Sequence, residues 1–498
     1  MRWCQREFFC AAHYCLSRVS VACLSRVSVA NVPDSHQRPR TLGELRAAGH
    51  RQRGVKDEIR GNLLAALRAG RDPWPGIVGF GDTVLPQLER ALIAGHDVVL
   101  LGERGQGKTR LLRSLVALLD EWAPVIAGSE LGEHPYQPIT PVSRRRAAEL
   151  GDELPITWRH RDERYTEKLA TPDTSVADLI GDVDPVKVAE GRSLGDPETI
   201  HYGLVPRAHR GIVAINELPD LAERIQVALL NVMEERDIQV RGYTLRLPLD
   251  VLLVASANPE DYTNRGRIIT PLKDRFGAEV RTHYPLEVAD EVELVAQEAR
   301  LVAQVPTHLL EVIARFARQL RESSAVDQRS GVSARFAIAA AEIVAAAALR
   351  RSALTGEDTP VARPVDLDTV PDVLRGKLEF ESGFDDDSGR RQEIMDHLLR
   401  KATAETARAR LSGLDLNPLA EAVARRPVRT GERVPAADVV SALPRLNVLT
   451  EVARRLSAHG TEAPGPMASA AELALELLFL TRRLAKETED ETASVVYG

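Results

Sequence analysis

The sequence predicts an α/β fold built on a parallel β-sheet, followed by a region that is almost entirely helical. Three short apolar runs, each suited to a strand that is buried on both faces, alternate with segments of helical periodicity. From Leu286 onward the pattern is nearly all helical. Strands that alternate with helices are typical of a parallel sheet covered by helices.

The composition is that of a folded protein with a sizeable core. The chain has 498 residues, of which 44% are hydrophobic and 28% are charged. At about 100–200 residues per domain, this length suggests about three domains. All four cysteines lie in the first 23 residues, which excludes a disulfide framework or a cysteine zinc site in the rest of the chain. The net charge of −7 argues against general polyanion binding.

The amino-terminal residues 1–40 are expected to be a disordered extension. Residues 15–22 (CLSRVSVA) are repeated letter for letter at 23–30, and arginines interrupt the apolar stretch that a signal peptide requires. One explanation is a start codon assigned too far upstream, with the true start near Val32. No uninterrupted apolar run reaches the roughly 18 residues of a membrane span, so we expect a cytoplasmic protein with no membrane partner.

The expected elements divide the chain into consecutive segments. Strands are expected at 97–101, 211–215 and 251–256, helices at 84–94, 111–119 and 221–235, a hairpin at 238–247 and a polar insertion at 124–170. The resulting segments are an N-terminal helical segment (41–71), an α/β core (72–285), a helical lid (286–381), a linker (382–390) and a C-terminal helical region (391–498). We expect the last ten residues, 489–498, to be disordered.

A glycine loop follows the first expected strand. Gly102-Glu103-Arg104-Gly105-Gln106-Gly107-Lys108-Thr109 matches G-x-x-x-x-G-K-[ST] at every fixed position, with a strand before it and a helix after it. The glycines let backbone N–H groups surround phosphates, and the helix N-terminus adds a favourable dipole. Lys108 is expected to reach the β- and γ-phosphates, and the Thr109 hydroxyl to bind Mg²⁺. The motif therefore predicts ATP and Mg²⁺ as cofactors, and we include Arg110 among the nucleotide-binding residues.

A second polar site follows the second expected strand. The chain has Asn216 and Glu217 where a P-loop protein is expected to carry an acidic pair. Asn216 keeps an oxygen near the metal but lacks the charge, so we expect slow basal hydrolysis and faster turnover after Asn216→Asp. Glu217 is the expected general base. An ordinary helix N-terminus is the structural alternative for this pair.

Three further residues are candidates for phosphate recognition. Asn258, at the tip of the third strand, is placed to bind the γ-phosphate or the attacking water. Arg275 follows a proline turn and is expected to reach the nucleotide of a neighbouring subunit. Arg335, in the first turn of a helix, is expected to contact phosphate in its own subunit. Each has a plainer alternative: a turn for Asn258, and a solvated or ion-paired surface charge for either arginine.

Taken together, these motifs resemble the AAA+ ATPases, and most closely the I subunit of magnesium chelatase. The resemblance spans roughly residues 72–380, and the insertions near 186–205 and 238–247 are similar to those of the helix-2-insert branch, which also holds the MoxR-like ATPases. It implies that Ile77, Val78 and Gly79 lie beside the adenine. The segments that carry it are 77–79, 181–191, 203–211, 257–261, 274–277 and 364–377.

The resemblance implies a homo-oligomeric ring, usually a hexamer, that hydrolyses MgATP to remodel or activate a partner protein, one with a von Willebrand factor A domain by family analogy. Metal insertion into a porphyrin is not implied by the motifs. A hydrolysis-impaired, ATP-dependent scaffold or switch stays open because of Asn216. A sigma-54-dependent transcription activator is disfavoured because no GAFTGA-type loop is found. The arginine runs at 144–146 and 159–164 have acidic neighbours, so no nucleic-acid partner is expected.

Overall fold

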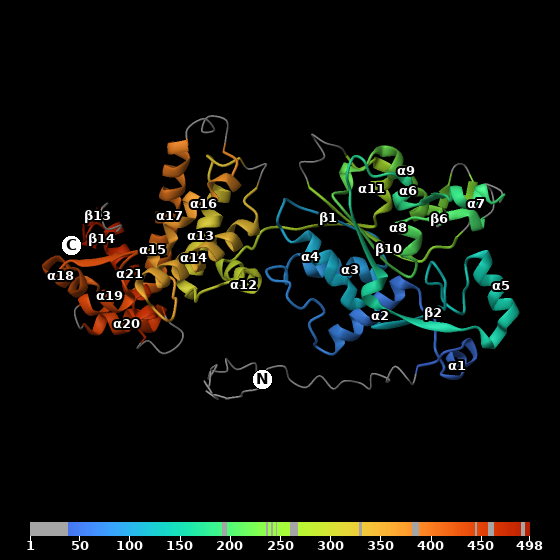
Figure 1. Cartoon of the computed structure of the whole chain (residues 1–498), viewed down its shortest axis with the longest axis horizontal. Coiled ribbons are helices and arrows are strands. Elements are labelled where there is room, and N and C mark those ends of the chain that lie inside the picture. Colours follow the sequence, from blue (N-terminus) through green and yellow to red (C-terminus); the bar gives the residue numbers. More distant parts are fainter. Residues whose placement is uncertain are drawn as a thin grey trace, which may run out of the picture.

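The computed structural model describes residues 38–498 apart from 192–196, 236–237, 241–242, 246, 259–266, 328–330, 381–387, 444–445, 457–462 and 490–493. Its amino-terminal part is an α/β unit and its carboxyl-terminal part is mainly helical, as the sequence predicts (Figure 1). Within the described ranges, no helix is both long and apolar enough to cross a bilayer.

A five-stranded parallel sheet forms the centre of the α/β unit, with the strand order β11-β1-β10-β7-β4. The strands are β1 (Val98–Leu101), β4 (Tyr165–Leu169), β7 (Gly211–Asn216), β10 (Val251–Ala257) and β11 (Ala278–Arg281). The three predicted strands are confirmed as β1, β7 and β10, which are buried along their whole length.

The two edge strands, β4 and β11, were not predicted. Both are largely half-buried and carry charged residues, so they lack the continuous apolar run that identifies a strand buried on both faces. The prediction that 124–170 is an insertion is therefore wrong for 165–169, which belong to the central sheet. The rest of that segment forms an antiparallel pair, β2 (Trp122–Ile126) with β3 (Ile156–His160), and the helix α5 (Pro141–Leu150).

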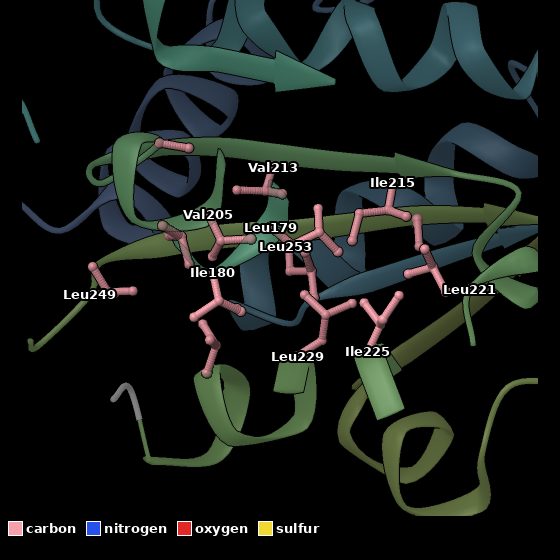
Figure 2. Close-up of a cluster of buried hydrophobic side chains, with 14 of the residues drawn as sticks. Leu179, Ile180, Val205, Val213, Ile215, Leu221, Ile225, Leu229, Leu249 and Leu253 are labelled. Atoms are coloured by element: carbon pink, nitrogen blue, oxygen red, sulfur yellow. The ribbon is translucent and has the colours of Figure 1, made fainter. Parts of the chain in front are cut away.

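Helices cover both faces of the central sheet. One face packs against α2 (Val55–Arg68), α3 (Val84–Ala94) and α4 (Lys108–Ser114). The other packs against α6 (Val176–Leu179), α8 (Leu204–Arg207), α9 (Glu223–Glu235) and α11 (Thr270–Arg275). Figure 2 shows this second core, where Val213 and Leu253 of the sheet face Leu229 of α9. Because side chains alternate along a strand, even-numbered residues of β7 point to the α4 side.

Smaller elements surround the sheet. The predicted hairpin is confirmed as β8 (Ile238–Val240) with β9 (Tyr243–Leu245), and its turn residues 241–242 lie outside the described residues. A second antiparallel pair joins β5 (Gly181–Val183) to β6 (Ile200–Tyr202). The remaining helices of this part are α1 (Leu42–Ala47) and α7 (Pro185–Ala189). Short 3-10 turns occur at 115–118, 151–153, 161–164, 197–199, 218–220 and 375–377.

The amino-terminal residues that the structure describes pack on the β2–β3 pair. The Arg38 guanidinium lies 3.9 Å from the centre of the Trp122 ring, and the Trp158 indole donates to the Pro39 carbonyl at 2.9 Å. Residues 1–37, with the repeat, lie outside the described residues.

The carboxyl-terminal part has two cores. The first is formed by α12 (Val288–Glu298), α13 (Thr307–Glu322), α14 (Ala334–Thr355), α15 (Pro364–Leu367), α16 (Thr369–Leu374) and the first half of α17 (Ser388–Leu411). The second is formed by the rest of α17 with α18 (Asn417–Arg425), α19 (Ala436–Ala442), α20 (Asn447–Leu456) and α21 (Pro464–Leu480). Residues 382–387 of the expected linker (382–390) lie outside the described residues, and residues 388–390 belong to α17 and not to a linker.

The C-terminal region also contains a three-stranded antiparallel sheet that was not predicted. Its order is β12 (Val428–Gly431), β14 (Ser494–Tyr497) and β13 (Lys486–Glu489). The expected disorder of the last ten residues is wrong for 494–497, because β14 is the central strand of this sheet. The Tyr497 hydroxyl also donates to the Glu476 carboxylate on α21.

Candidate functional site

The glycine loop joins β1 to α4 at the carboxyl edge of the sheet. Its Gly102 N–H donates to the Ala257 carbonyl at 3.1 Å, which fixes the start of the loop beside the end of β10. Gly105 and Gly107 both have φ of +76°, a backbone conformation that residues with a Cβ rarely adopt. The helix α4 begins directly after them at Lys108. The motif therefore has the strand, loop and helix that its sequence predicts.

Lys108, Asn258 and Glu217 form one chain of hydrogen bonds. The Lys108 ammonium is buried and donates to the Asn258 Oδ1 at 2.6 Å, and also to the carbonyls of Gly102 and Glu103. Asn258 Nδ2 donates to Glu217 Oε2 at 2.8 Å. The structure thus brings together three of the predicted site residues: Lys108 begins α4, Asn258 follows β10 and Glu217 follows β7.

Glu217 has an unusual backbone. It adopts a left-handed conformation with φ of +56° and ψ of +49°, which costs an L-residue about 1–2 kcal/mol. Its N–H donates to the Ser256 hydroxyl on β10 at 3.2 Å. Strained residues of this kind concentrate at functional sites when the surrounding structure holds them. A cavity of about 280 Å³ lies beside Glu217, and it is lined by Arg104, Leu169, Ala170, Thr171, Pro172, Glu217, Asp220 and Asn258.

Asn216 is buried next to the Lys108, Asn258 and Glu217 group, but its side chain forms hydrogen bonds with other residues. Its Nδ2 donates to Glu167 Oε1 on β4 at 2.7 Å, and its Oδ1 accepts from the Ser256 hydroxyl at 3.2 Å. Glu167 also receives two hydrogen bonds from Arg113, at 2.7 and 2.9 Å, and these bonds lower the pKa of its carboxyl. The sequence analysis identified neither Glu167 nor its partner Arg113. The polar segment 165–169 (YTEKL) has no pattern that indicates a strand beside β7, so nothing pointed to Glu167.

The segment expected beside the adenine faces the first helix of the lid. Ile77, Val78 and Gly79 are half-buried, and Gly79 has φ of +78° with the Asp290 side chain of α12 beside it. The Gly76 carbonyl accepts from Gln297 Nε2 at 3.2 Å. Arg110, on α4, forms an ion pair with Glu298 of the same helix α12. Ile77–Gly79 and α4 are therefore both joined to the lid.

The N-terminus of α14 meets the glycine loop. Tyr284 donates from its hydroxyl to the Arg104 carbonyl at 2.8 Å, and Ser333, the residue before α14, lies directly against Gly105. Arg335 is exposed in the first turn of α14, two residues beyond Ser333. Thr109 is half-buried in the first turn of α4.

Arg275 does not contact the hydrogen-bonded group of Lys108, Asn258 and Glu217 through any of its ion pairs. It ends α11 with its side chain 40% exposed, and it pairs with Glu234 at 2.7 Å and with Asp274 at 3.0 Å. The hydrogen bond that Arg275 donates to Glu234 raises the pKa of the guanidinium. Neither partner belongs to the group around Lys108. A second cavity, of about 430 Å³, is lined by residues of the glycine loop, α11 and β11 together with their neighbours: Leu101, Gly102, Glu103, Gln106, Lys273, Glu279, Arg281 and Thr282.

Comparisons with known proteins agree with the predicted resemblance. Residues 191–275 match the model of the Sigma-54 interaction domain. The magnesium-chelatase subunit ChlI of a Nostoc species is 30% identical over 244 residues, which cover 48% of this chain and 61% of that protein. The magnesium-chelatase 38 kDa subunit of Cereibacter sphaeroides is 30% identical over 238 residues, covering 45% and 63%. The chain thus spans about three fifths of the length of these relatives.

Two solved structures are similar to this chain at lower identity. A model of the complex between the BchI and BchD subunits of magnesium chelatase is 18% identical, covers 82% of this chain and 94% of that one, and has a TM-score of 0.34. The RuvB Holliday junction branch migration motor of Thermotoga maritima is 17% identical, covers 78% and 85%, and has a TM-score of 0.32. The chain therefore has a parallel α/β fold with a P-loop motif, and it is similar to the I subunit of magnesium chelatase over the residues that the two share.

Proposed function

We propose that this protein binds and hydrolyses MgATP in a homo-oligomeric ring, and that it uses the resulting motion to remodel or activate a partner protein. The observation that carries the proposal is the hydrogen-bonded chain of Lys108, which begins α4, with Asn258 and Glu217, which follow β10 and β7. In this order, the Lys108 cation can bind a phosphate group, the Asn258 amide can hold the water that attacks it in line, and the Glu217 carboxylate can act as the base for that water.

Each site residue has a role in this proposal. Lys108 neutralises charge on the β- and γ-phosphates, and backbone N–H groups between Gly102 and Gly107 surround them. Glu217 accepts the proton of the attacking water, and Asn258 holds that water or the γ-phosphate. Ile77–Gly79 and Arg110 lie on the adenine side, while Arg335 contacts phosphate from the lid. These are proposals for residues whose positions are described above.

The donor set fits Mg²⁺. Thr109, Asn216 and Glu217 offer hydroxyl, amide and carboxylate oxygens, which are the donors that Mg²⁺ prefers, and no thiol or imidazole is among them. When bound, the ion neutralises charge on the phosphate oxygens. Thr109 would hold it directly, and Asn216 would act from a greater distance through ordered water.

The ring is proposed from Arg275. Arg275 is exposed and does not belong to the hydrogen-bonded group of Lys108 in its own subunit. It is therefore available to complete the site of a neighbouring subunit, where it would stabilise charge on the transferring phosphoryl group. A hexamer and a partner with a von Willebrand factor A domain are proposed by analogy with the magnesium-chelatase I subunits, to which the chain is similar. Metal insertion is not part of the proposal.

Two other functions have specific support. Asn216, which lacks the carboxylate charge, supports an ATP-dependent scaffold or switch that hydrolyses poorly. The match of 191–275 to the Sigma-54 interaction domain supports a transcription activator, against which stands the absence of a GAFTGA-type loop from the sequence.

One assay separates the motor from the switch. Phosphate release from ATP is measured for the unaltered chain and for Glu217→Gln, with binding of a fluorescent ATP analogue measured in parallel. Steady turnover that falls at least about a hundredfold in Glu217→Gln, with binding retained, supports the motor. Binding without turnover in both proteins would favour the switch.

A further inference from the structure

The side-chain amide of Asn216 has both of its ends engaged. Its Nδ2 lies 2.7 Å from Glu167 Oε1, and its Oδ1 lies 3.2 Å from the Ser256 hydroxyl. A carboxylate can only accept hydrogen bonds, so the amide nitrogen must be the end that faces Glu167. An aspartate at position 216 would place two anionic oxygens at this separation. The contact therefore gives a physical reason for an asparagine where a P-loop protein is expected to carry an aspartate.

Strand geometry brings the three polar residues to the same face of the sheet. On β7, Asn216 shares its face with Ile212 and Ala214, which belong to the core on the α4 side. Ser256 has the same parity as Val254 on β10, another member of that core. Glu167 on β4 has the parity of Tyr165, which packs against the same core. All three therefore lie on the side of the sheet that carries α4 and the glycine loop.

Arg113 links this group to the nucleotide-binding helix. It lies four residues after Thr109 on α4, so the two side chains leave the same face of the helix. Arg113 donates a hydrogen bond to each carboxylate oxygen of Glu167, at 2.7 and 2.9 Å. Its side chain is 64% exposed and that of Glu167 only 20%, so water screens the arginine charge more than the carboxylate charge. The negative end of the pair is the one that faces Asn216.

We propose that Glu167 and Asn216 together replace the aspartate that a P-loop protein is expected to carry beside Mg²⁺ at position 216. Glu167 supplies the negative charge, and the Asn216 amide, which is hydrogen-bonded to it, lies between that charge and the metal. Glu167 is a positioning residue in this arrangement, because it acts through Asn216 and fixes the orientation of its amide. The inference rests on the proposed function, since it concerns the Mg²⁺ that accompanies ATP.

This arrangement reverses one expectation drawn from the sequence. With Glu167 in contact, Asn216→Asp alone is expected to impair the site rather than to speed it, because like charges would meet at 2.7 Å. The double variant Glu167→Gln/Asn216→Asp exchanges the two groups and keeps one charge and one amide. It should therefore recover what each single variant loses.

The test measures the affinity of a non-hydrolysable ATP analogue as Mg²⁺ is varied, together with the thermal unfolding midpoint in Mg²⁺ and analogue. Glu167→Gln and Asn216→Asp should each raise the Mg²⁺ concentration for half-maximal binding by about tenfold, and the double variant should return to within about twofold of the unaltered chain. Glu198→Gln is the matched control: Glu198 pairs with Arg145, with exposures of 22% and 63%. This control should leave the Mg²⁺ requirement unchanged.

The outcomes separate this inference from the proposed function. If the unaltered chain binds the analogue with Mg²⁺ and Glu167→Gln has the same Mg²⁺ requirement, the inference is wrong and the function stands. A double variant as impaired as the worse single variant also overturns the inference. If the unaltered chain does not bind the analogue at all, the proposed function fails and the inference fails with it.

Discussion

Ser333, the residue before α14, lies directly against Gly105 in the glycine loop. A Cβ built on Gly105 would stand 2.1 Å from the Cβ of Ser333 and 2.8 Å from its Cα. A methyl group does not fit in that space, so the glycine permits the lid to meet the loop. The contact joins two segments more than two hundred residues apart in the sequence, and it makes the lid part of the proposed nucleotide site.

The first prediction concerns this contact. Gly105→Ala should weaken ATP binding by at least about tenfold, because both the clash and the positive φ push the loop or the lid out of place. Gly49→Ala is the matched control, since Gly49 has φ of +69° but nothing within 4 Å of an added Cβ. Thermal unfolding and binding of a fluorescent ATP analogue are measured for both. Equal binding by the two variants would mean that the lid contact does not matter for the nucleotide.

The second prediction concerns the buried ammonium. Lys108→Ala should abolish detectable binding or hydrolysis of ATP, because it removes the only charge in the Lys108, Asn258 and Glu217 chain that attracts phosphate. Lys401→Ala, which removes an exposed lysine from α17, should leave both unchanged. Calorimetric titration with ATP and a phosphate-release assay measure the two effects. Unchanged affinity and turnover in Lys108→Ala would exclude this site assignment.

The third prediction concerns assembly. Arg275→Ala should slow hydrolysis by about 10³-fold or more while leaving ATP binding nearly intact, because arginine fingers act on the transferring phosphoryl group. Loss of its exposed ion pair with Glu234 should leave the unfolding midpoint nearly unchanged, because exposed ion pairs contribute little to stability. Arg454→Ala, which breaks another exposed pair, with Glu451, is the control. Turnover and unfolding midpoints are compared among the three proteins.

Mixing two inactive variants tests whether Arg275 acts on a neighbour. A Lys108→Ala subunit has no working site but keeps its arginine, whereas an Arg275→Ala subunit has a sound site and no arginine to offer. Mixed rings should therefore regain part of the activity. Continued inactivity, in rings shown by mass spectrometry to contain both subunits, would argue against a role across the interface.

The fourth prediction concerns stability at acid pH. Burial lowers the pKa of His134 to about 2 and that of His209 to about 3, and both side chains are almost fully buried. In the unfolded chain both would titrate near pH 6.5. The unfolded state therefore binds more protons below that pH, and stability falls as the pH drops from about 6.5 toward 3, by up to about 1.4 kcal/mol per pH unit for each histidine.

Urea unfolding between pH 7.5 and 4.5 measures this slope. His209→Asn should reduce it, because the asparagine Oδ1 retains an acceptor for the Asp250 N–H, which now donates to His209 Nδ1 at 3.1 Å, and does not bind protons in this range. His397→Asn, which changes an exposed histidine on α17, should leave the slope as it is. A slope unchanged in His209→Asn would show that His209 does not contribute to the pH dependence.

Much of the candidate nucleotide site could be located from the sequence because its signals are local. The glycine loop occupies eight consecutive residues, and its strand is recognisable because β1 is buried along its whole length. The same reasoning identified β7 and β10, and with them Glu217 and Asn258, since the carboxyl ends of neighbouring parallel strands meet at one edge of a sheet. The fold class follows from these local patterns.

Only the tertiary structure revealed the rest. Glu167 lies 49 residues before Asn216, on an edge strand whose polar sequence does not indicate a strand at all. The strand β14 was not predicted for a similar reason, because it is a four-residue element whose pairing with β12 and β13 has no local signal. The contact of Ser333 with Gly105 depends on how the lid packs. Sequence patterns record which residues are buried and which turns are permitted, whereas such pairings depend on long-range packing that has no local signature.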